Sequence, residues 1–179
     1  ITIDVADDKT LTYSGDVISL GATTLTMSGG GRFRNGLVVL DLNNTSSKLL
    51  LNSITVDSVR TSSNSLGLDV DNNSTVTSLT VAHITPVSIA GSKILSGAIT
   101  VTAGSIKLDE TGTLASTISM SGGELDADNS STLSGTLTQA GNITIDVADN
   151  KTLTYSGTAL SLGANTLTLS GGGTLSNTN

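Results

Sequence analysis

The residues from Ile1 to Gly31 read ITIDVADDKTLTYSGDVISLGATTLTMSGGG, and those from Ile143 to Gly173 read ITIDVADNKTLTYSGTALSLGANTLTLSGGG. The two stretches are identical at 25 of 31 positions and lie 142 residues apart. Self-similarity at a fixed period is the sequence signature of solenoids, propellers and other repeat arrays. The recurrence therefore makes a stacked repeat protein the first hypothesis for the fold.

A shorter period of about 20 residues runs between the two copies and fits one coil of a parallel β-helix. It divides the sequence into seven units, which are 16–36, 37–58, 59–78, 79–97, 98–116, 117–135 and 136–157. We therefore expect residues 1–179 to form one continuous β-solenoid of about eight coils. The long repeat, in which 1–31 matches 143–173, then spans a whole number of coils.

Within the units, aliphatic residues alternate with hydroxyl residues, which is the pattern of a strand with one buried and one solvent face. The clearest examples are Ile1-Thr2-Ile3, Leu25-Thr26-Met27, Leu79-Thr80-Val81, Ile99-Thr100-Val101, Ile118-Ser119-Met120 and Leu167-Thr168-Leu169. No segment keeps helical spacing for more than a turn. The pattern predicts an all-β fold, a single-stranded parallel β-helix with almost no helix.

Two kinds of break separate the strands. Glycine-rich breaks such as Ser28-Gly29-Gly30-Gly31 suit tight corners, because glycine readily adopts positive φ. The other breaks are rich in Asp and Asn, as in the segments that begin at Asp4, Asp41, Asp69, Asp126 and Asp146. We interpret the latter as a second type of corner.

The composition excludes several classes of function. The formal net charge is −7, which disfavours nucleic acid and anionic membrane surfaces as partners. No apolar run is long enough to insert into a bilayer. The chain has no cysteine, so disulfides, thiolate metal sites and cysteine nucleophiles are absent. Only two tyrosines and one phenylalanine are present, which predicts a thin aliphatic core.

The units TISMSGGELDADNSSTLSG (117–135) and TALSLGANTLTLSGGGTLSN (158–177) combine aliphatic-Thr-aliphatic strands with Ser-Gly-Gly corners. In this, the chain resembles the passenger regions of bacterial autotransporter adhesins and filamentous-haemagglutinin-like exoproteins along essentially its whole length. The resemblance implies export, a right-handed β-helix and display at the cell surface or in the extracellular space. It supplies no catalytic signature and identifies no receptor.

The Asp-rich corners are candidate calcium sites, since Ca²⁺ takes six to eight oxygen ligands and would neutralise stacked carboxylates. The candidate ligands are Asp4, Asp7, Asp69, Asp71, Asp126, Asp128, Asp146 and Asp149. We favour the alternative that Asp and Asn in these corners form turns by bonding their own backbone. We expect no other cofactor.

An enzyme of the polysaccharide lyase or hydrolase type is an alternative, but it needs a carboxylate pair or a poised base. The sequence offers only two glutamates, Glu110 and Glu124, and one histidine, His83, which we interpret as a surface residue. Threonine ladders also suggest an ice-binding face, although most strands carry one Thr and not two.

We therefore expect no catalysis and a structural or adhesive rod that contacts a host or neighbouring-cell ligand. Unpaired strand edges at the two ends favour self-association, end to end or lateral. The basic positions Arg32 and Arg34 replace Thr174 and Ser176 of the second copy. We interpret them as part of a solvated face, with contact to a neighbouring protomer as the alternative.

Overall fold

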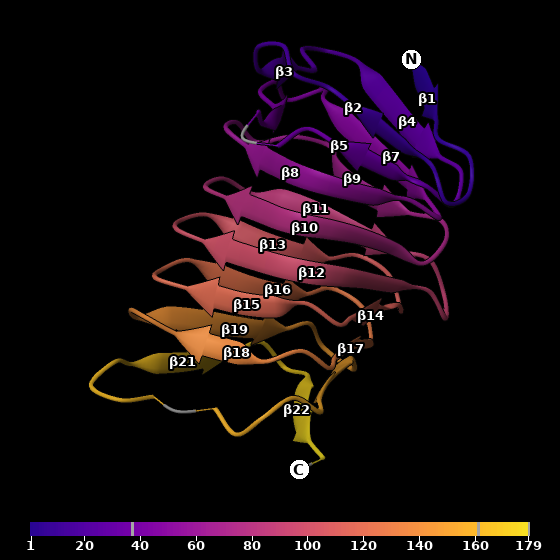
Figure 1. The fold of residues 1–179 in the computed structure, drawn as a ribbon. Helices are drawn as coiled ribbons and strands as arrows, with labels where there is room; N and C mark the ends of the chain where they lie inside the picture. Colours follow the sequence, from indigo (N-terminus) through magenta and orange to yellow (C-terminus); the bar gives the residue numbers. More distant parts are fainter. Residues whose placement is uncertain (37, 161, 179) are drawn as a thin grey trace.

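The computed structural model describes residues 1–36, 38–160 and 162–178. Every regular element in these three stretches is a β-strand, and none is a helix. The strands of successive turns pair in parallel and stack along one axis, as Figure 1 shows. The prediction of an all-β parallel solenoid is confirmed.

Face A of the solenoid is a sheet of nine strands, one from each turn. In spatial order these are β1 (Thr2–Asp4), β4 (Thr24–Ser28), β7 (Lys48–Asn52), β9 (Gly67–Val70), β11 (Thr85–Ile89), β13 (Ser105–Leu108), β16 (Glu124–Ala127), β19 (Ile143–Val147) and β21 (Leu167–Ser170). The chain thus makes about nine turns with a spacing near 20 residues, close to the expected eight coils.

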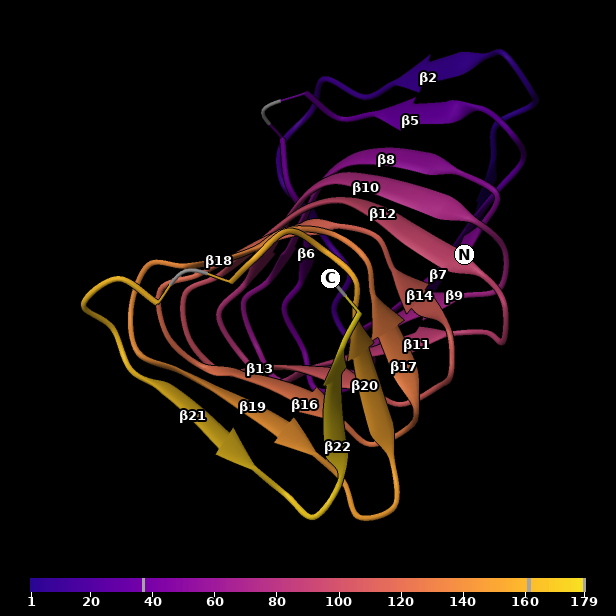
Figure 2. The ribbon, with the colours of Figure 1, turned by 90° about the horizontal axis from the view of Figure 1, so that it is seen from below.

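The second sheet has 13 strands and covers the other two sides of the coil. Face B contains β2 (Thr10–Thr12), β5 (Arg32–Arg34), β8 (Thr55–Thr61), β10 (Ser74–Val81), β12 (Ile94–Val101), β14 (Thr113–Leu114), β17 (Ser131–Leu133), β20 (Thr152–Tyr155) and β22 (Thr174–Asn177). Face C contains β3 (Ile18–Ser19), β6 (Leu40–Leu42), the second halves of β8, β10 and β12, β15 (Thr117–Met120) and β18 (Leu137–Gln139). Figure 2 shows the strands of face B fanning out from β2 to β22.

The long repeat corresponds to seven turns. On face A, seven strands from β1 to β16 precede β19, which is the equivalent of β1 in the second copy. Pairing is also the same in both copies, since Thr2 lies opposite Thr26 and Thr144 lies opposite Thr168. One repeat therefore advances about 34 Å along the axis, at about 4.8 Å per turn.

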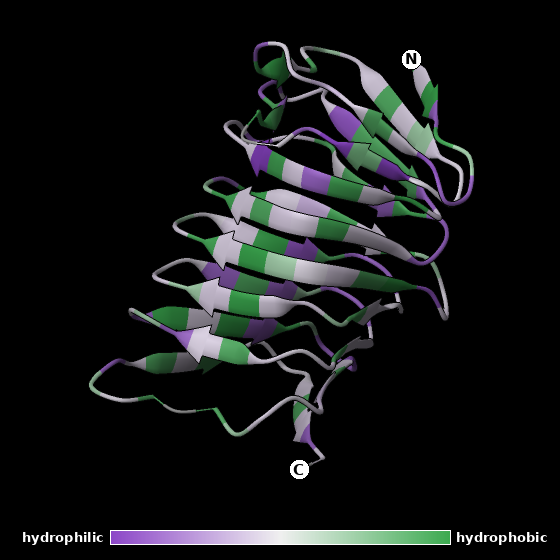
Figure 3. Cartoon of the chain, in the orientation of Figure 1, coloured by the Kyte–Doolittle hydropathy of each residue, from purple (hydrophilic) through white to green (hydrophobic). Residues whose placement is uncertain are grey.

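The core is built from apolar ladders in which each residue sits above its counterpart in the previous turn. On face A one such ladder is Leu25, Leu49, Leu68, Val87, Leu108, Ala127 and Val147, and all seven side chains are buried. The alternation of apolar and polar residues along the strands is visible in Figure 3. Because each strand offers only two or three inward residues, the burial that stabilises a turn comes from its neighbours.

The acidic and glycine-rich breaks after β1 and β4 occupy the same corner of the coil, where face A meets face B. They stack on each other: Gly31 N donates to the carbonyl of Val5 at 3.0 Å. A Cβ on Gly29, whose φ is +91°, would lie 2.1 Å from that same carbonyl oxygen, so the corner requires glycine. The first residues of the acidic segments, Asp4, Asp41, Asp69, Asp126 and Asp146, lie in strands, and the residues that follow them form the corners.

Candidate functional site

Four of the eight aspartates proposed as calcium ligands belong to the two repeat copies: Asp4 ends β1, Asp146 lies in β19, and Asp7 and Asp149 lie in the corner between faces A and B. The Ser28 hydroxyl lies 2.6 Å from an oxygen of Asp4, and the equivalent pair, Ser170 and Asp146, is 2.5 Å apart. Asp7 accepts a hydrogen bond from the backbone N–H of Gly30 at 2.8 Å. These carboxylates therefore bind the glycine corner of the next turn.

Asp149 repeats the position of Asp7 in the second copy. A Cβ added to Gly172 would lie 1.9 Å from an oxygen of Asp149, so this carboxylate also lies directly over a glycine of the next turn. Lack of a side chain at Gly172 is what admits the carboxylate. The carboxylate therefore contacts the next turn and not the backbone of its own corner.

Of the remaining candidates, Asp69 and Asp126 lie in strands of face A, and Asp71 and Asp128 lie just beyond those strands. Three of the four pair with lysines of neighbouring turns. Lys48 lies 2.5 Å from Asp69, and Lys107 lies 3.0 Å from Asp126 and 2.6 Å from Asp128. The hydrogen bonds from Asp128 and Asp126 raise the pKa of Lys107 above its ordinary value. Each pair ties one turn to the next. Asp71 is exposed.

Among residues 1–36, 38–160 and 162–178, no three Asp, Glu or His side chains lie close enough together to hold a metal ion. The eight aspartates are instead distributed over several turns of the same edge. Calcium binding by these residues stays a prediction, which a measurement described below tests.

The residues considered for catalysis lie in different turns and at different places in the coil. His83 is exposed in the corner between faces C and A, Glu110 is exposed beyond β13, and Glu124 begins β16. Burial raises the pKa of Glu124, and the nearby charges of Asp126 and Asp146 raise it further. The structure does not bring these three side chains into one constellation.

Pro86, beside His83 in sequence, lies inside β11 and does not interrupt the stack. A Cβ on Gly67, whose φ is +84°, would lie 1.9 Å from the Pro86 carbonyl oxygen. Regular pairing with β9 begins one residue later, at Val87. The absence of a side chain at Gly67 therefore gives the Pro86 carbonyl room to approach.

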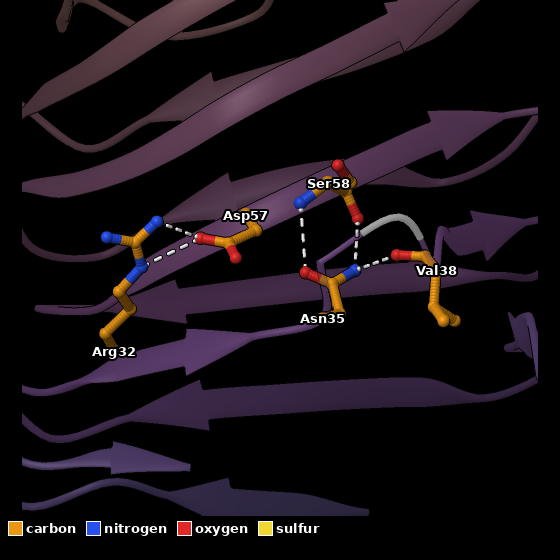
Figure 4. Close-up of polar contacts among 5 residues, drawn as sticks. All are labelled: Arg32, Asn35, Val38, Asp57 and Ser58. Atoms are coloured by element: carbon orange, nitrogen blue, oxygen red, sulfur yellow. Dashed lines mark hydrogen bonds and ion pairs between the residues drawn. The ribbon is translucent and has the colours of Figure 1, made fainter. Parts of the chain in front are cut away.

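Faces B and C of the second and third turns hold polar contacts that sequence reasoning missed, shown in part in Figure 4. Arg32 Nε and Nη2 donate to one oxygen of Asp57 at 2.8 and 2.5 Å. Arg32 is exposed, as expected for a solvated face, and its guanidinium also pairs with Asp57 of the next turn. The only signal in the sequence is their separation by 25 residues, close to one turn.

Asn35 is fully buried beside this pair and joins two turns through the backbone. Its amide nitrogen donates to the carbonyls of Val38 at 2.7 Å and Ser58 at 2.8 Å, and its oxygen accepts from Ser58 N at 3.0 Å. In these three bonds the amide nitrogen donates twice and the amide oxygen accepts once. The arrangement fixes the corner between faces B and C in this turn.

A second ion pair lies on face C, where Arg60 Nη2 donates to Asp41 at 2.6 Å. Only 6% of the Asp41 side chain is exposed, against 43% for Arg60. The hydrogen bond from Asp41 and its charge raise the pKa of Arg60. The other Asp41 oxygen is buried and has no hydrogen-bond partner in the described structure. The positive charge of Arg60 therefore compensates the buried negative charge of the Asp41 carboxylate.

Beyond this pair the outward positions of face C become a ladder of hydroxyl residues. The ladder is Thr80, Thr100, Ser119 and Thr138, which lie opposite one another in successive turns. Face B carries a similar ladder of Thr113, Thr132, Thr154 and Ser176. These ladders present one hydroxyl per turn at the strand spacing, about 4.8 Å.

Comparison with protein-family models, with curated proteins and with solved structures found no match to this chain. Within the residues that the structure describes, there is no helix long and apolar enough to cross a membrane.

Proposed function

We propose that this chain is a segment of an extracellular structural or adhesive rod, of the kind that bacteria secrete or display, and that it performs no catalysis. The observation that supports this most is the direction of its contacts. The strand pairs, the apolar ladders and the ion pairs all join one turn to the next along a single axis. Such a structure transmits force along its length and grows longer when turns are added.

The outer faces support an adhesive role for the rod. Hydroxyl groups repeat once per turn on faces B and C, and carboxylates repeat along the edge of face A. A ligand that meets such a ladder makes several weak contacts at once. Tethering the contacts to one stiff scaffold raises the effective concentration of each, which gives avidity without a deep pocket.

Labelling of intact cells tests the location. Antibodies raised against the folded chain should label unpermeabilised cells that make the protein, or the protein in their culture medium. Labelling that appears only after permeabilisation would contradict an extracellular rod.

Adhesion is tested with beads that carry the folded chain. They should attach to cells or to extracellular matrix more strongly than beads carrying the heat-unfolded chain. Attachment should also rise steeply with the density of chains on the bead. Equal attachment of folded and unfolded chains would remove the adhesive part of the proposal and leave the structural part.

A further inference from the structure

The two copies of the repeated segment, 1–31 and 143–173, lie at opposite ends of the solenoid in Figure 1. The first copy has turns only after it in the structure, and the second copy has a complete stack before it. The same sequence is therefore seen in two environments. Each copy shows what covers the side that the other copy leaves open.

Apolar side chains of the first copy are open to solvent on the side that faces away from the stack, whereas their equivalents in the second copy are covered. The exposed fractions are 81% for Ile1 against 3% for Ile143, and 45% for Leu11 against 0% for Leu153. Tyr13 is 38% exposed, and Tyr155 is 6% exposed. In the first copy, Leu11 and Tyr13 border an apolar groove of about 410 Å³, which Ile3, Ile18 and Phe33 also line.

The turn that covers the second copy consists of β16, β17 and β18. Leu125 of β16 lies opposite Ile145, and Leu133 of β17 lies opposite Tyr155. The Tyr155 hydroxyl accepts a hydrogen bond from Leu137 N at 3.3 Å and donates to the carbonyl of Thr158. Apolar contact, strand pairing and the hydrogen bond from Leu137 thus come from the covering turn, whereas Thr158 belongs to the turn of Tyr155 itself.

On the side of each copy that faces the C-terminal end of the solenoid, the first copy is covered and the second is exposed. Met27 of the first copy is fully buried under Leu51 of β7, whereas its equivalent in the second copy, Leu169, is 59% exposed. Each exposed side of one copy therefore has an equivalent in the other copy that a neighbouring turn covers. The segment 1–142 is therefore a seven-turn unit whose two ends are complementary.

We propose that the open side of the first turn, formed by Ile1, Ile3, Leu11, Tyr13 and Ile18, docks on residues 117–142 of a second copy of the repeat 1–142. This deepens the proposed rod function by naming the partner of its end. The register is that of the second copy: Ile3 lies on Leu125, Thr12 on Thr132 and Tyr13 on Leu133 of the other copy. Repeats joined in this way continue one uninterrupted solenoid.

The test uses a tandem chain in which residues 1–142 are followed directly by residues 1–179. Thr132 of the first copy and Thr12 of the second are both replaced by Cys in this otherwise cysteine-free protein. Paired residues on neighbouring strands have Cα atoms about 5 Å apart, within the range that a disulfide spans. We expect complete disulfide formation within the chain under mild oxidation.

The matched control moves the second cysteine from position 12 to position 10 of the same strand. This places the two Cα atoms about 8 Å apart, beyond disulfide reach. No disulfide should form in the control. Equal crosslinking of both pairs, or of neither, would overturn the proposed docking.

Tyrosine nitration of the unsubstituted tandem chain provides a readout that needs no cysteine. The complete chain should show one reactive tyrosine, Tyr13, because Tyr155 is covered. In the tandem chain the tyrosine at the junction should be protected, so the reactive count stays at one; a second reactive tyrosine would contradict the docking. Small-angle scattering of the same sample separates the two proposals, since a compact particle would instead overturn the rod.

Discussion

The Asn35 side chain replaces backbone pairing at a corner where two turns meet. Its amide satisfies two carbonyls and one N–H that are otherwise enclosed. Replacing Asn35 with Ala should lower the free energy of unfolding by about 2–3 kcal/mol, because each buried group left unsatisfied costs about 1–3 kcal/mol. Urea unfolding followed by circular dichroism measures this loss.

Asn177 provides the control, since it occupies the equivalent place in the second copy but is exposed. The substitution Asn177→Ala should cost less than Asn35→Ala, because groups that lose a partner at an exposed position are solvated by water. If the two variants lost equal stability, burial of the Asn35 amide would not be the source of its effect.

Glu124 makes stability depend on pH through its raised pKa, which is caused first by burial and then by Asp126 and Asp146. A raised pKa means that the folded chain favours the protonated acid. Its contribution is present below the unfolded pKa and is lost as the pH rises through the folded value. Glu124→Gln should therefore raise the melting temperature at pH 7. The corresponding gain in the free energy of unfolding should be at most about 0.5 kcal/mol.

The gain from Glu124→Gln should disappear near pH 3, where the native glutamate is protonated in both states. Melting curves of the two proteins at several pH values show this convergence. A constant difference between them at every pH would mean that the substitution acts through packing and not through charge.

At the scale of the strand, outward positions of face C form one ladder whose chemistry changes along the axis. Asp41 and Arg60 occupy it in the early turns, and hydroxyl residues occupy it from Thr80 onward. Arg60→Thr alone should cost about 2 kcal/mol, because it leaves the buried Asp41 carboxylate without compensation. The double variant with Asp41→Ser extends the hydroxyl ladder and should recover most of that loss.

A double-mutant cycle measured by urea unfolding gives the coupling between the two positions. Thr100→Ser, farther along the same ladder, serves as the control and should change stability little. Additive losses from Asp41→Ser and Arg60→Thr would show that the pair is not coupled.

The strands were predictable from the sequence because their side-chain period is local. Leu79-Thr80-Val81 lies in β10, and Ile118-Ser119-Met120 lies in β15, each with the aliphatic residues buried as the alternation indicates. The ion pairs were not predictable. Asp41 meets Arg60 because 19 residues separate them and one turn happens to have that length at this face. Turn length varies, since Thr2 and Thr26 pair across 24 residues, so composition alone does not show which polar residues meet.

At the scale of the whole molecule, the aspartates along the edge of face A decide whether an ion contributes to stability. Asp7 accepts a backbone N–H, and Asp69, Asp126 and Asp128 have lysine partners. We therefore expect the melting temperature to be the same after treatment with a chelator as before it. A rise of several degrees on adding calcium, absent with magnesium, would favour a calcium-stabilised module instead.

Stacking along one axis also predicts how the solenoid tolerates deletions. Leu79 pairs with Ile99, so removing residues 79–98 takes out one complete turn and brings Ser78 before Ile99 in the original register. On face A, Leu68 then lies under Leu108, because both belong to the same buried ladder through Val87. The shortened chain should keep its strand spectrum and unfold cooperatively, since each turn contacts only its neighbours.

Removing only residues 79–88 is the comparison that separates register from length. This deletion takes out about half a turn, so every later strand would have to pair on the wrong face of the coil and apolar ladders would meet corners. It should abolish cooperative unfolding although it removes fewer residues. If the shorter deletion were the better tolerated one, the number of residues lost and not the integrity of the turn would govern stability, and the axial stacking derived from the ladders would be contradicted.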